Sequence, residues 1–279
     1  MKIAVVGCVH GEFEKIYKKI QENPGVDLLL CCGDLEAART LSDRQCMVNP
    51  RQKLKGLFSK PSGKEGTFYK YYSGQLVAPV LTIVIGGELE SSNYLQELPY
   101  GGWLCHNIYF LGYSGIIDVS DSNGKVFLTV GGLSGLYKER IFESNRTEKL
   151  PYDENTIKSI NCFRNMDKFR LELMLKGSVD IMLSHDWPNQ IEGLDNYGVR
   201  EGSVGSHHVR NIMKKLVPKF WFSALFSTNR QSKFSTELNF ENGITKFSAL
   251  ACTIKCQVEG DQMEIIDFKD QISGLQGYS

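Results

Sequence analysis

The chain has 279 residues, 32 of them basic and 32 acidic, so its formal net charge at neutral pH is zero. A chain of this length forms one large domain or two small ones, with room for a substantial core. The balanced charge excludes a uniformly basic nucleic-acid coat protein, although it allows a local basic patch. The longest apolar runs fall short of the roughly 20 residues that span a bilayer, so no membrane partner is expected.

The chain begins with a pattern of alternating strands and helices. Apolar segments at 2–7 and 27–32 flank a polar stretch, 11–23, whose apolar residues recur at helical spacing. A strand, a helix and a strand within this span form a βαβ unit, which implies two parallel strands. We expect further strands at 80–85, 108–112, 126–131 and 180–184, a weaker one at 69–72, and helices at 155–176 and 209–216. Residues 220–268 have a pattern typical of strands and turns, so the whole predicts one layered α/β domain.

Eight cysteines are scattered along the chain without paired C-x-x-C spacing. This usage favours a reducing compartment over a disulfide scaffold. The chain does not open on the charged, apolar and small-residue pattern of a signal peptide. We therefore expect a nuclear protein, a cytoplasmic protein, or one found in both compartments.

Basic residues accumulate between Arg51 and Lys70, where Glu65 is the single acid, and aromatic residues follow closely. One interpretation is a solvated surface loop. The other is a loop whose lysines contact RNA phosphates while neighbouring rings stack on bases. The residues predicted to contact RNA are Lys53, Lys55, Lys60, Lys64, Lys70, Tyr69, Tyr71 and Tyr72.

Polar side chains follow four of the predicted strands. Cys8 and His10 follow the first strand, Asp34 the second, Glu88 the strand at 80–85, and His185 the strand at 180–184. Ligands of open α/β sheets bind beyond the carboxyl ends of the strands, so these side chains are expected to converge. Thiolate, imidazole and carboxylate groups together can hold a divalent metal. The sequence therefore indicates that these strand ends can hold a metal, and these five residues are the candidate ligands.

Four of the five candidate ligands also have a structural interpretation. Cys8 can be a small buried apolar residue, and His10 a polar wall residue. Asp34 can cap the turn after its strand. His185 can form a hydrogen-bonded pair with Asp186. The residues alone leave these alternatives open.

The strand-end segments C-x-H-G, G-D, G-G-x-x-E and S-H-D-W-P resemble those of the calcineurin-like metallophosphoesterases. Longer segments, among them CCGDLEA, TFYKYYSG and PKFWFSA, resemble the intron lariat debranching enzymes of that family, in which a cysteine replaces the usual first aspartate. The resemblance extends from Met1 to about Phe268 and implies a layered α/β/β/α sandwich. It also implies an RNA-processing role linked to mRNA splicing, namely hydrolysis of the 2′–5′ phosphodiester at the branch adenosine of excised introns.

The resemblance further implies roles for individual residues. His10 and Asp34 would be metal ligands, with Asp34 able to bridge two ions. Cys8 would lie beside the first metal position and His185 would serve the second. In a two-metal site, the cations hold the phosphate while hydroxide attacks in line.

Two motifs of the resembled family are changed in this chain. The family sequence G-G-N-H-E corresponds to Gly86–Glu90, where Glu88 replaces the amide ligand and Leu89 replaces the histidine that protonates the leaving oxygen. The family's last metal motif, H-x-H, corresponds to a segment with Leu225 and Ser227 in place of its histidines. General acid catalysis alone typically contributes about 10²–10⁴-fold to a rate. We therefore expect no full two-metal centre and either no metal or one divalent ion (Mn, Fe, Zn or Mg).

The resemblance also frames the domain organisation. We expect a metallophosphoesterase-like domain at 1–270, with a basic loop insertion at about 37–77. Residues 271–279 are expected to form a flexible tail. The further C-terminal domain typical of the resembled enzymes is expected to be absent.

The favoured functional hypothesis is a pseudoenzyme that keeps the fold and has lost hydrolysis. It would bind branched or single-stranded RNA, or an RNA-processing protein, without cleavage. One alternative is a phosphodiesterase that uses a single metal, with another acid such as Glu90. A second alternative is a protein-interaction scaffold without an RNA role. The sequence predicts neither the oligomeric state nor the identity of the partner.

Overall fold

The computed structural model describes residues 1–48, 66–191, 205–224, 234–241, 243–250 and 263–267. Within these residues the predicted βαβ unit is confirmed, because β1 (Lys2–Val6) and β2 (Val26–Cys31) pair in parallel around α1 (Phe13–Glu22). Four buried side chains, Phe13, Ile16, Tyr17 and Ile20, lie on one face of α1 and fix this helix on the sheet. No described helix is long and apolar enough to cross a membrane.

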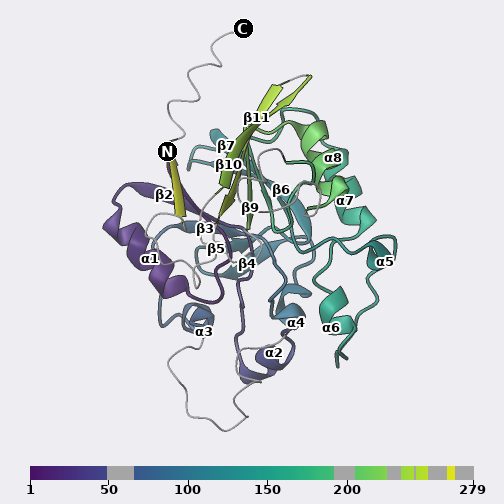
Figure 1. Ribbon diagram of the computed structural model, residues 1–279. Coiled ribbons are helices and arrows are strands. Elements are labelled where there is room, and N and C mark those ends of the chain that lie inside the picture. Colours follow the sequence, from purple (N-terminus) through teal and green to yellow (C-terminus); the bar gives the residue numbers. More distant parts are fainter. Residues whose placement is uncertain (49–65, 192–204, 225–233, 242, 251–262, 268–279) are drawn as a thin grey trace.

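The first sheet has six strands in the order β12-β1-β2-β3-β5-β4 (Figure 1). Its other members are β3 (Leu81–Val84), β4 (Gly102–Cys105), β5 (Ile108–Phe110) and β12 (Met263–Asp267). The four central strands run parallel, while β12 and β4 pair antiparallel at the two edges. The carboxyl ends of β1, β2 and β3 therefore lie at one edge of the sheet.

The second sheet also has six strands, in the order β10-β11-β9-β8-β7-β6. They are β6 (Ser114–Ser120), β7 (Val126–Leu133), β8 (Ile181–Ser184), β9 (Phe220–Ala224), β10 (Phe234–Phe240) and β11 (Gly243–Leu250). The strands β7, β8, β9 and β11 are parallel neighbours, and β6 and β10 pair antiparallel at the edges. The strand-rich character predicted for residues 220–268 is confirmed in the described part of that segment.

The two sheets pack face to face on a shared apolar core. Val5, Leu30 and Ile83 of the first sheet belong to the same buried cluster as Leu183 and Phe222 of the second. A second cluster packs α1 and α3 (Phe68–Tyr72) on the outer face of the first sheet, and a third packs α7 (Asn165–Glu172) and α8 (His207–Leu216) on the second. Figure 1 shows these helices on opposite sides of the paired sheets. The predicted α/β/β/α sandwich is thus confirmed.

Two predicted elements were wrong. Residues 69–72 form part of helix α3 instead of a strand, because Phe68 and Tyr71, three positions apart, both turn into the core. The single helix predicted at 155–176 is two helices, α6 (Thr156–Ser159) and α7. Between them the buried Arg164 adopts an extended backbone. The remaining short helices are α2 (Leu41–Gln45), α4 (Ser92–Leu95) and α5 (Glu139–Phe142).

Candidate metal centre

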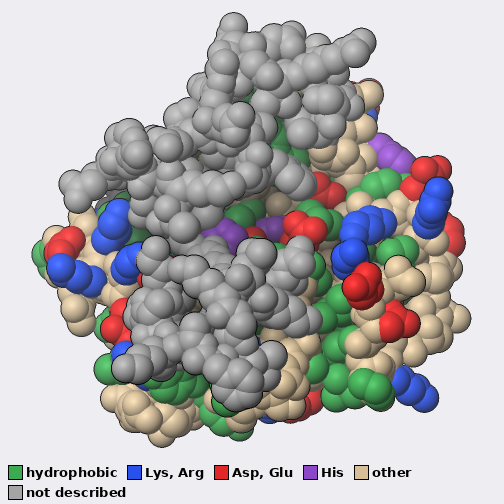
Figure 2. All heavy atoms as spheres, turned by 60° about the horizontal axis from the view of Figure 1, so that its bottom comes forward, with side chains coloured by type: hydrophobic (Ala, Val, Ile, Leu, Met, Phe, Trp, Pro, Cys, Tyr) green, Lys and Arg blue, Asp and Glu red, His purple; other side chains and the backbone are tan. Residues whose placement is uncertain are grey.

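The loops that follow β1 and β2 are joined at the edge where the two sheets meet. The Val9 N–H donates to the Gly33 carbonyl oxygen at 3.0 Å, and the His10 N–H donates to the Asp34 carbonyl oxygen at 2.6 Å. These bonds place the first two predicted ligand segments side by side. Figure 2 shows histidine side chains near the middle of this face, with acidic side chains beside them.

Asp34 lies at the centre of the predicted ligands and is buried, with 4% of its surface exposed. Its Oδ1 is 3.6 Å from His185 Nε2, and its Oδ2 is 3.8 Å from His10 Nε2. One ligand atom from each of Cys8, Asp34 and His185 lies within 4.8 Å of the others. The structure therefore brings together sulfur, oxygen and nitrogen donors from the loops after β1, β2 and β8, as expected from the strand-end pattern.

The orientation of His185 suits a metal ligand. Its Nδ1 is 2.7 Å from the Cys32 carbonyl oxygen, which can only accept a hydrogen bond, so Nδ1 carries the proton. The lone pair of a neutral ring is then on Nε2, the atom that faces Asp34. Histidines that bind metals typically donate their other ring N–H to a carbonyl or carboxylate in this way. In the alternative interpretation His185 pairs with Asp186, but in the structure the Asp186 carboxylate accepts hydrogen bonds from the N–H groups of Tyr137 and Trp187.

Asp34 has the charge state that a metal ligand needs. Burial alone would raise the pKa of its carboxyl group, but His185, His10, the Leu89 N–H and the Cys8 thiol outweigh that effect. The net result is a pKa below the ordinary value, so the group is ionised at neutral pH. The backbone at Asp34 has a positive φ of 53°, which aspartate tolerates better than most residues.

Two glycines make room for this arrangement. A Cβ atom at Gly33 would lie 2.6 Å from His185 Nδ1, and one at Gly87 would lie 2.3 Å from Asp34 Oδ1. Gly33 also has a φ of 110°, which favours glycine. Gly33 of the G-D segment and Gly87 of the G-G segment are therefore required by the close approach of the Asp34 and His185 side chains.

Glu88 and Leu89 occupy different positions relative to Asp34. The Glu88 side chain is exposed and is not part of the donor cluster among the described residues. Its carbonyl oxygen accepts a hydrogen bond from Asn161 Nδ2 at 3.0 Å. Leu89 is at the site, since its N–H donates to Asp34 Oδ1 at 2.8 Å. The other two changed positions, Leu225 and Ser227, lie outside the described residues.

Two carboxylates near the site were missing from the predicted ligand set. Glu36 Oε1 is 3.5 Å from His10 Nδ1, and the only sequence signal for it was its place two residues after Asp34. Glu90, considered only as a replacement acid, is 1% exposed and accepts N–H bonds from Leu35, Glu36 and Gly87 at 2.7 to 3.2 Å. Burial, together with the charge of Asp34, raises the pKa of Glu90 to about 8. Through these hydrogen bonds the Glu90 carboxyl group joins the loop after β2 to the loop after β3.

The predicted RNA-contacting residues are only partly described. Tyr71 is buried against Phe13 and Tyr17, so its predicted stacking on an RNA base is wrong. Lys70 forms an ion pair with Glu14 at 2.7 Å. Tyr69 is half-buried, and Tyr72 is 48% exposed and packs edge-on against Tyr94. The other predicted contacts, Lys53, Lys55, Lys60 and Lys64, lie outside the described residues.

The chain is similar to known proteins over most of its length. A sequence model of the calcineurin-like phosphoesterase family matches residues 1–224. A lariat debranching enzyme from Drosophila pseudoobscura pseudoobscura is 44% identical over 244 residues, which are 80% of this chain and 42% of that protein.

Two further relatives show similar identity. Lariat debranching enzyme A from Xenopus laevis is 39% identical over 292 residues, covering 96% of this chain and 50% of the relative. The lariat debranching enzyme from Arabidopsis thaliana is 39% identical over 293 residues, covering 97% of this chain and 64% of the relative. The chain thus spans about half the length of the curated relatives it matches.

Proposed function

Because the chain belongs to the calcineurin-like phosphoesterase family, we propose that it binds branched RNA at the candidate metal centre without cleaving it at a useful rate. The debranching enzymes to which it is similar motivate the choice of branched RNA. The choice of binding over hydrolysis rests on the side chains at the centre. We also propose that the protein is located in the nucleus, the cytoplasm or both.

The observation that carries the proposal is the position of Leu89. Its N–H donates to the central carboxylate of Asp34, so residue 89 lies beside the candidate metal ligands. The resemblance places there a histidine that protonates the leaving oxygen, and a leucine side chain has no proton to give. Loss of such a general acid typically lowers a rate by about 10²–10⁴-fold. The expected loss of both imidazoles at Leu225 and Ser227 would act together with it, and such losses combine non-additively.

The donor set fits one divalent metal. Cys8, Asp34 and His185 offer a thiolate, a carboxylate oxygen and an imidazole nitrogen. The separation of 3.6 Å between His185 Nε2 and Asp34 Oδ1 is close to that of two ligands on one ion at about 2.0–2.2 Å from each. The mixture of soft and borderline donors favours Zn²⁺ or Fe²⁺ over Mg²⁺. When bound, the ion would supply positive charge that attracts a phosphate oxygen.

The proposal is tested with two measurements on one preparation. Metal content after purification without chelators is expected to approach one equivalent per chain. Binding of a labelled branched RNA with a 2′–5′ linkage is then compared with binding of a linear RNA of the same composition. We expect tighter binding of the branched RNA and no turnover with Mn²⁺, Fe²⁺ or Zn²⁺. Multiple turnover, or equal binding of the two RNAs, would overturn the proposal.

A second candidate is a phosphodiesterase with altered metal use, and one observation favours it. The two carboxylate oxygens of Asp34 face different histidines, with His185 on the Oδ1 side and His10 on the Oδ2 side. Such a carboxylate can serve either of two metal positions. If this candidate is correct, branched RNA is cleaved slowly, and both His10→Ala and His185→Ala abolish the cleavage. Cleavage that persists in both variants would point to a contaminating nuclease.

A further inference from the structure

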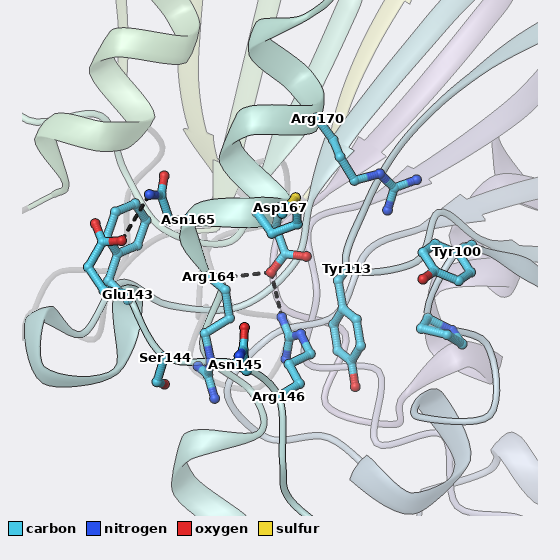
Figure 3. Close-up of a pocket in the computed structure, with 13 residues that line it drawn as sticks. Tyr100, Tyr113, Glu143, Ser144, Asn145, Arg146, Arg164, Asn165, Asp167 and Arg170 are labelled. Atoms are coloured by element: carbon cyan, nitrogen blue, oxygen red, sulfur yellow. Dashed lines mark hydrogen bonds and ion pairs between the residues drawn. The ribbon is translucent and has the colours of Figure 1, made fainter.

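A pocket of about 390 Å³ lies apart from the candidate metal ligands, between the start of α7, residues 142–146 and the turn at Pro99–Tyr100 (Figure 3). Its volume falls within the range of about 300–1,000 Å³ that small-molecule sites occupy. The predicted metal and RNA-contacting residues do not line it. Its polar walls are formed mainly by arginine, tyrosine and asparagine side chains.

Three arginines and two acids line the pocket, and most of these charges are already paired. Asp167 accepts from Arg146 Nη2 at 2.6 Å and from the Arg164 N–H at 2.8 Å. Arg164 is buried and pairs with Glu148 behind the pocket wall. In the part of the chain that the structure describes, Arg170 has no ion pair, so its charge is the one available to an anion in the pocket.

The aromatic rings of the pocket differ in their availability. Arg146 covers the ring of Tyr113, with its guanidinium carbon 3.4 Å from the ring centroid. Tyr100 is 77% exposed, and the Arg170 guanidinium lies over one face of its ring, with its carbon 5.0 Å from the ring centroid. Figure 3 shows Tyr100 and Arg170 on the same side of the pocket. An exposed ring beside an available guanidinium combines a surface for a base with a partner for a phosphate.

The pocket is connected to the loop that carries Glu88. Tyr113 lines both this pocket and a smaller cavity whose other walls include Gly87, Glu90 and Asn161. Asn161 in turn donates to the Glu88 carbonyl oxygen at 3.0 Å. Tyr113 and Asn161 therefore link the wall of the pocket to the loop after β3, which also carries Leu89 beside Asp34. A nucleic-acid strand at the metal centre would have the pocket beside its path.

We propose that this pocket binds one nucleotide of a single-stranded RNA arm that extends from the metal centre. The base stacks on Tyr100, the adjacent phosphate pairs with Arg170, and the exposed amide of Asn145 faces the base edge from the pocket wall. The inference rests on the proposed RNA-binding function. An acidic peptide could also pair with Arg170, but it would leave the exposed ring of Tyr100 without a planar partner.

The test compares two branched RNAs, one with a long single-stranded arm and one with that arm cut to a single nucleotide. Tyr100→Ala and Arg170→Ala are each expected to weaken binding of the long-arm RNA by about five-fold or more, because stacking and phosphate contacts are lost. Binding of the short-arm RNA is expected to stay unchanged. Arg170→Ala should also reduce the slope of log affinity against log salt by about one, and Arg170→Lys should keep most of the slope.

Trp103→Ala and Arg140→Ala are matched controls, since both are exposed residues outside the pocket. If the parent protein binds the long-arm RNA and Tyr100→Ala binds it equally well, the pocket assignment is overturned while RNA binding stands. Equal weakening of both RNAs would also overturn it. If the parent binds neither branched RNA, the proposed function fails and the inference falls with it. A poly-glutamate peptide that loses affinity in Arg170→Ala, with RNA binding unaffected, would identify the pocket as a protein-docking site instead.

Discussion

Gly87 lies where the loop after β3 passes the two central ligands. A methyl group there would lie 2.3 Å from Asp34 Oδ1 and 2.7 Å from His185 Cε1, so one of these side chains would have to move. We expect Gly87→Ala to weaken metal binding by about 10- to 100-fold, the usual cost of disturbing groups that orient metal ligands. The measurement is a calorimetric titration of metal into chelator-treated protein.

The neighbouring residue supplies the control for this prediction. A Cβ atom at Gly86 would meet only ordinary contacts, at 3.4 Å from Ser134 Cβ and 3.5 Å from Leu95 Cδ1. Gly86→Ala is therefore expected to bind metal nearly as well as the parent protein. Equal affinities in both variants would mean that Asp34 and His185 do not bind the ion in this geometry.

Sequence reasoning could predict that the central candidate ligands converge, because this needed only the ends of parallel strands. Cys8, Asp34 and His185 follow three such ends, and strand direction alone brings them together. Glu36 was missed because its approach to His10 depends on a positive φ of 50° in the loop, which the composition of the segment does not reveal. Tyr71 was misassigned because an aromatic residue near a basic loop has the same local signature whether it is exposed or buried.

At the scale of elements, the break between α6 and α7 is built around a buried ion pair. Arg164 Nη2 is 2.5 Å from Glu148 Oε1, and their side chains are 4% and 6% exposed. Removing the arginine leaves a buried carboxylate without its cation, which typically costs about 3–5 kcal/mol. We expect Arg164→Met to lower the free energy of unfolding by this amount in urea denaturation.

An exposed ion pair serves as the comparison for that measurement. Lys15 pairs with Glu12 at 3.0 Å, but the lysine side chain is 66% exposed. Such pairs contribute about 0–1 kcal/mol because solvent screens them. Lys15→Ala should therefore change the stability little, and a similar loss in the two variants would show that burial is not what makes the Arg164 pair important.

We expect the contact between α8 and α5 to depend on pH through His208. This ring stacks on Phe142 with 3.8 Å between the ring centroids. Burial lowers the pKa of His208 to about 4, and the charges of His207 and Lys168 add to this effect. The carboxylates of Glu143 and Glu172 oppose the shift. Between pH 6.5 and 4 the unfolded chain binds a proton that the folded chain does not. The stability contributed by the neutral ring is therefore present above pH 6.5 and is lost as the pH falls toward 4.

Urea denaturation at pH 7.5 and pH 5 measures this dependence. His208→Phe keeps an aromatic ring but cannot take up a proton, so it should lose less stability than the parent protein between these pH values. His106→Phe is the control, because His106 is exposed and is not among the groups that shift the pKa of His208. A parent protein and His208→Phe variant with the same pH dependence would contradict the assignment.

Helices and strands were predictable where the spacing of apolar residues within the segment itself identifies the element. The apolar strands and the amphipathic α1 and α8 have a periodicity that the sequence shows directly. The break in 155–176 was not visible because it depends on Arg164, whose Nη1 donates to the carbonyl oxygens of Ser159 and Cys162. The edge strands β4 and β6 are only partly buried, so their apolar pattern is weak.

At the scale of the whole molecule, the candidate metal ligands come from both sheets. Cys8 and Asp34 follow β1 and β2 of the first sheet, and His185 follows β8 of the second. The order and directions of the strands made this convergence predictable. The residues outside the described ranges include Leu225 and Ser227, where the resemblance predicts the loss of two histidines, and four of the predicted RNA-contacting lysines, so those predictions stay as they were made. The described residues thus establish the layered fold, whether or not the candidate metal centre at the edge of the sheets binds an ion.

Because its ligands belong to two sheets, a bound ion would link the two halves of the sandwich. Binding that occurs only in the folded state stabilises it by RT ln(1 + [M]/Kd), about 2.7 kcal/mol at a metal concentration one hundred times Kd. We expect Zn²⁺ or Fe²⁺ to raise the unfolding temperature of chelator-treated protein by several degrees. Cys8→Ala and His185→Gln should lose most of this rise, whereas Cys105→Ala, at the end of the edge strand β4, should keep it. If Cys8→Ala keeps the full rise, the metal is bound elsewhere and the thiol is only a core side chain. If the parent protein shows no rise with either ion, the three donors do not form a metal site, and branched-RNA binding, if observed, would have to proceed without the charge of a metal.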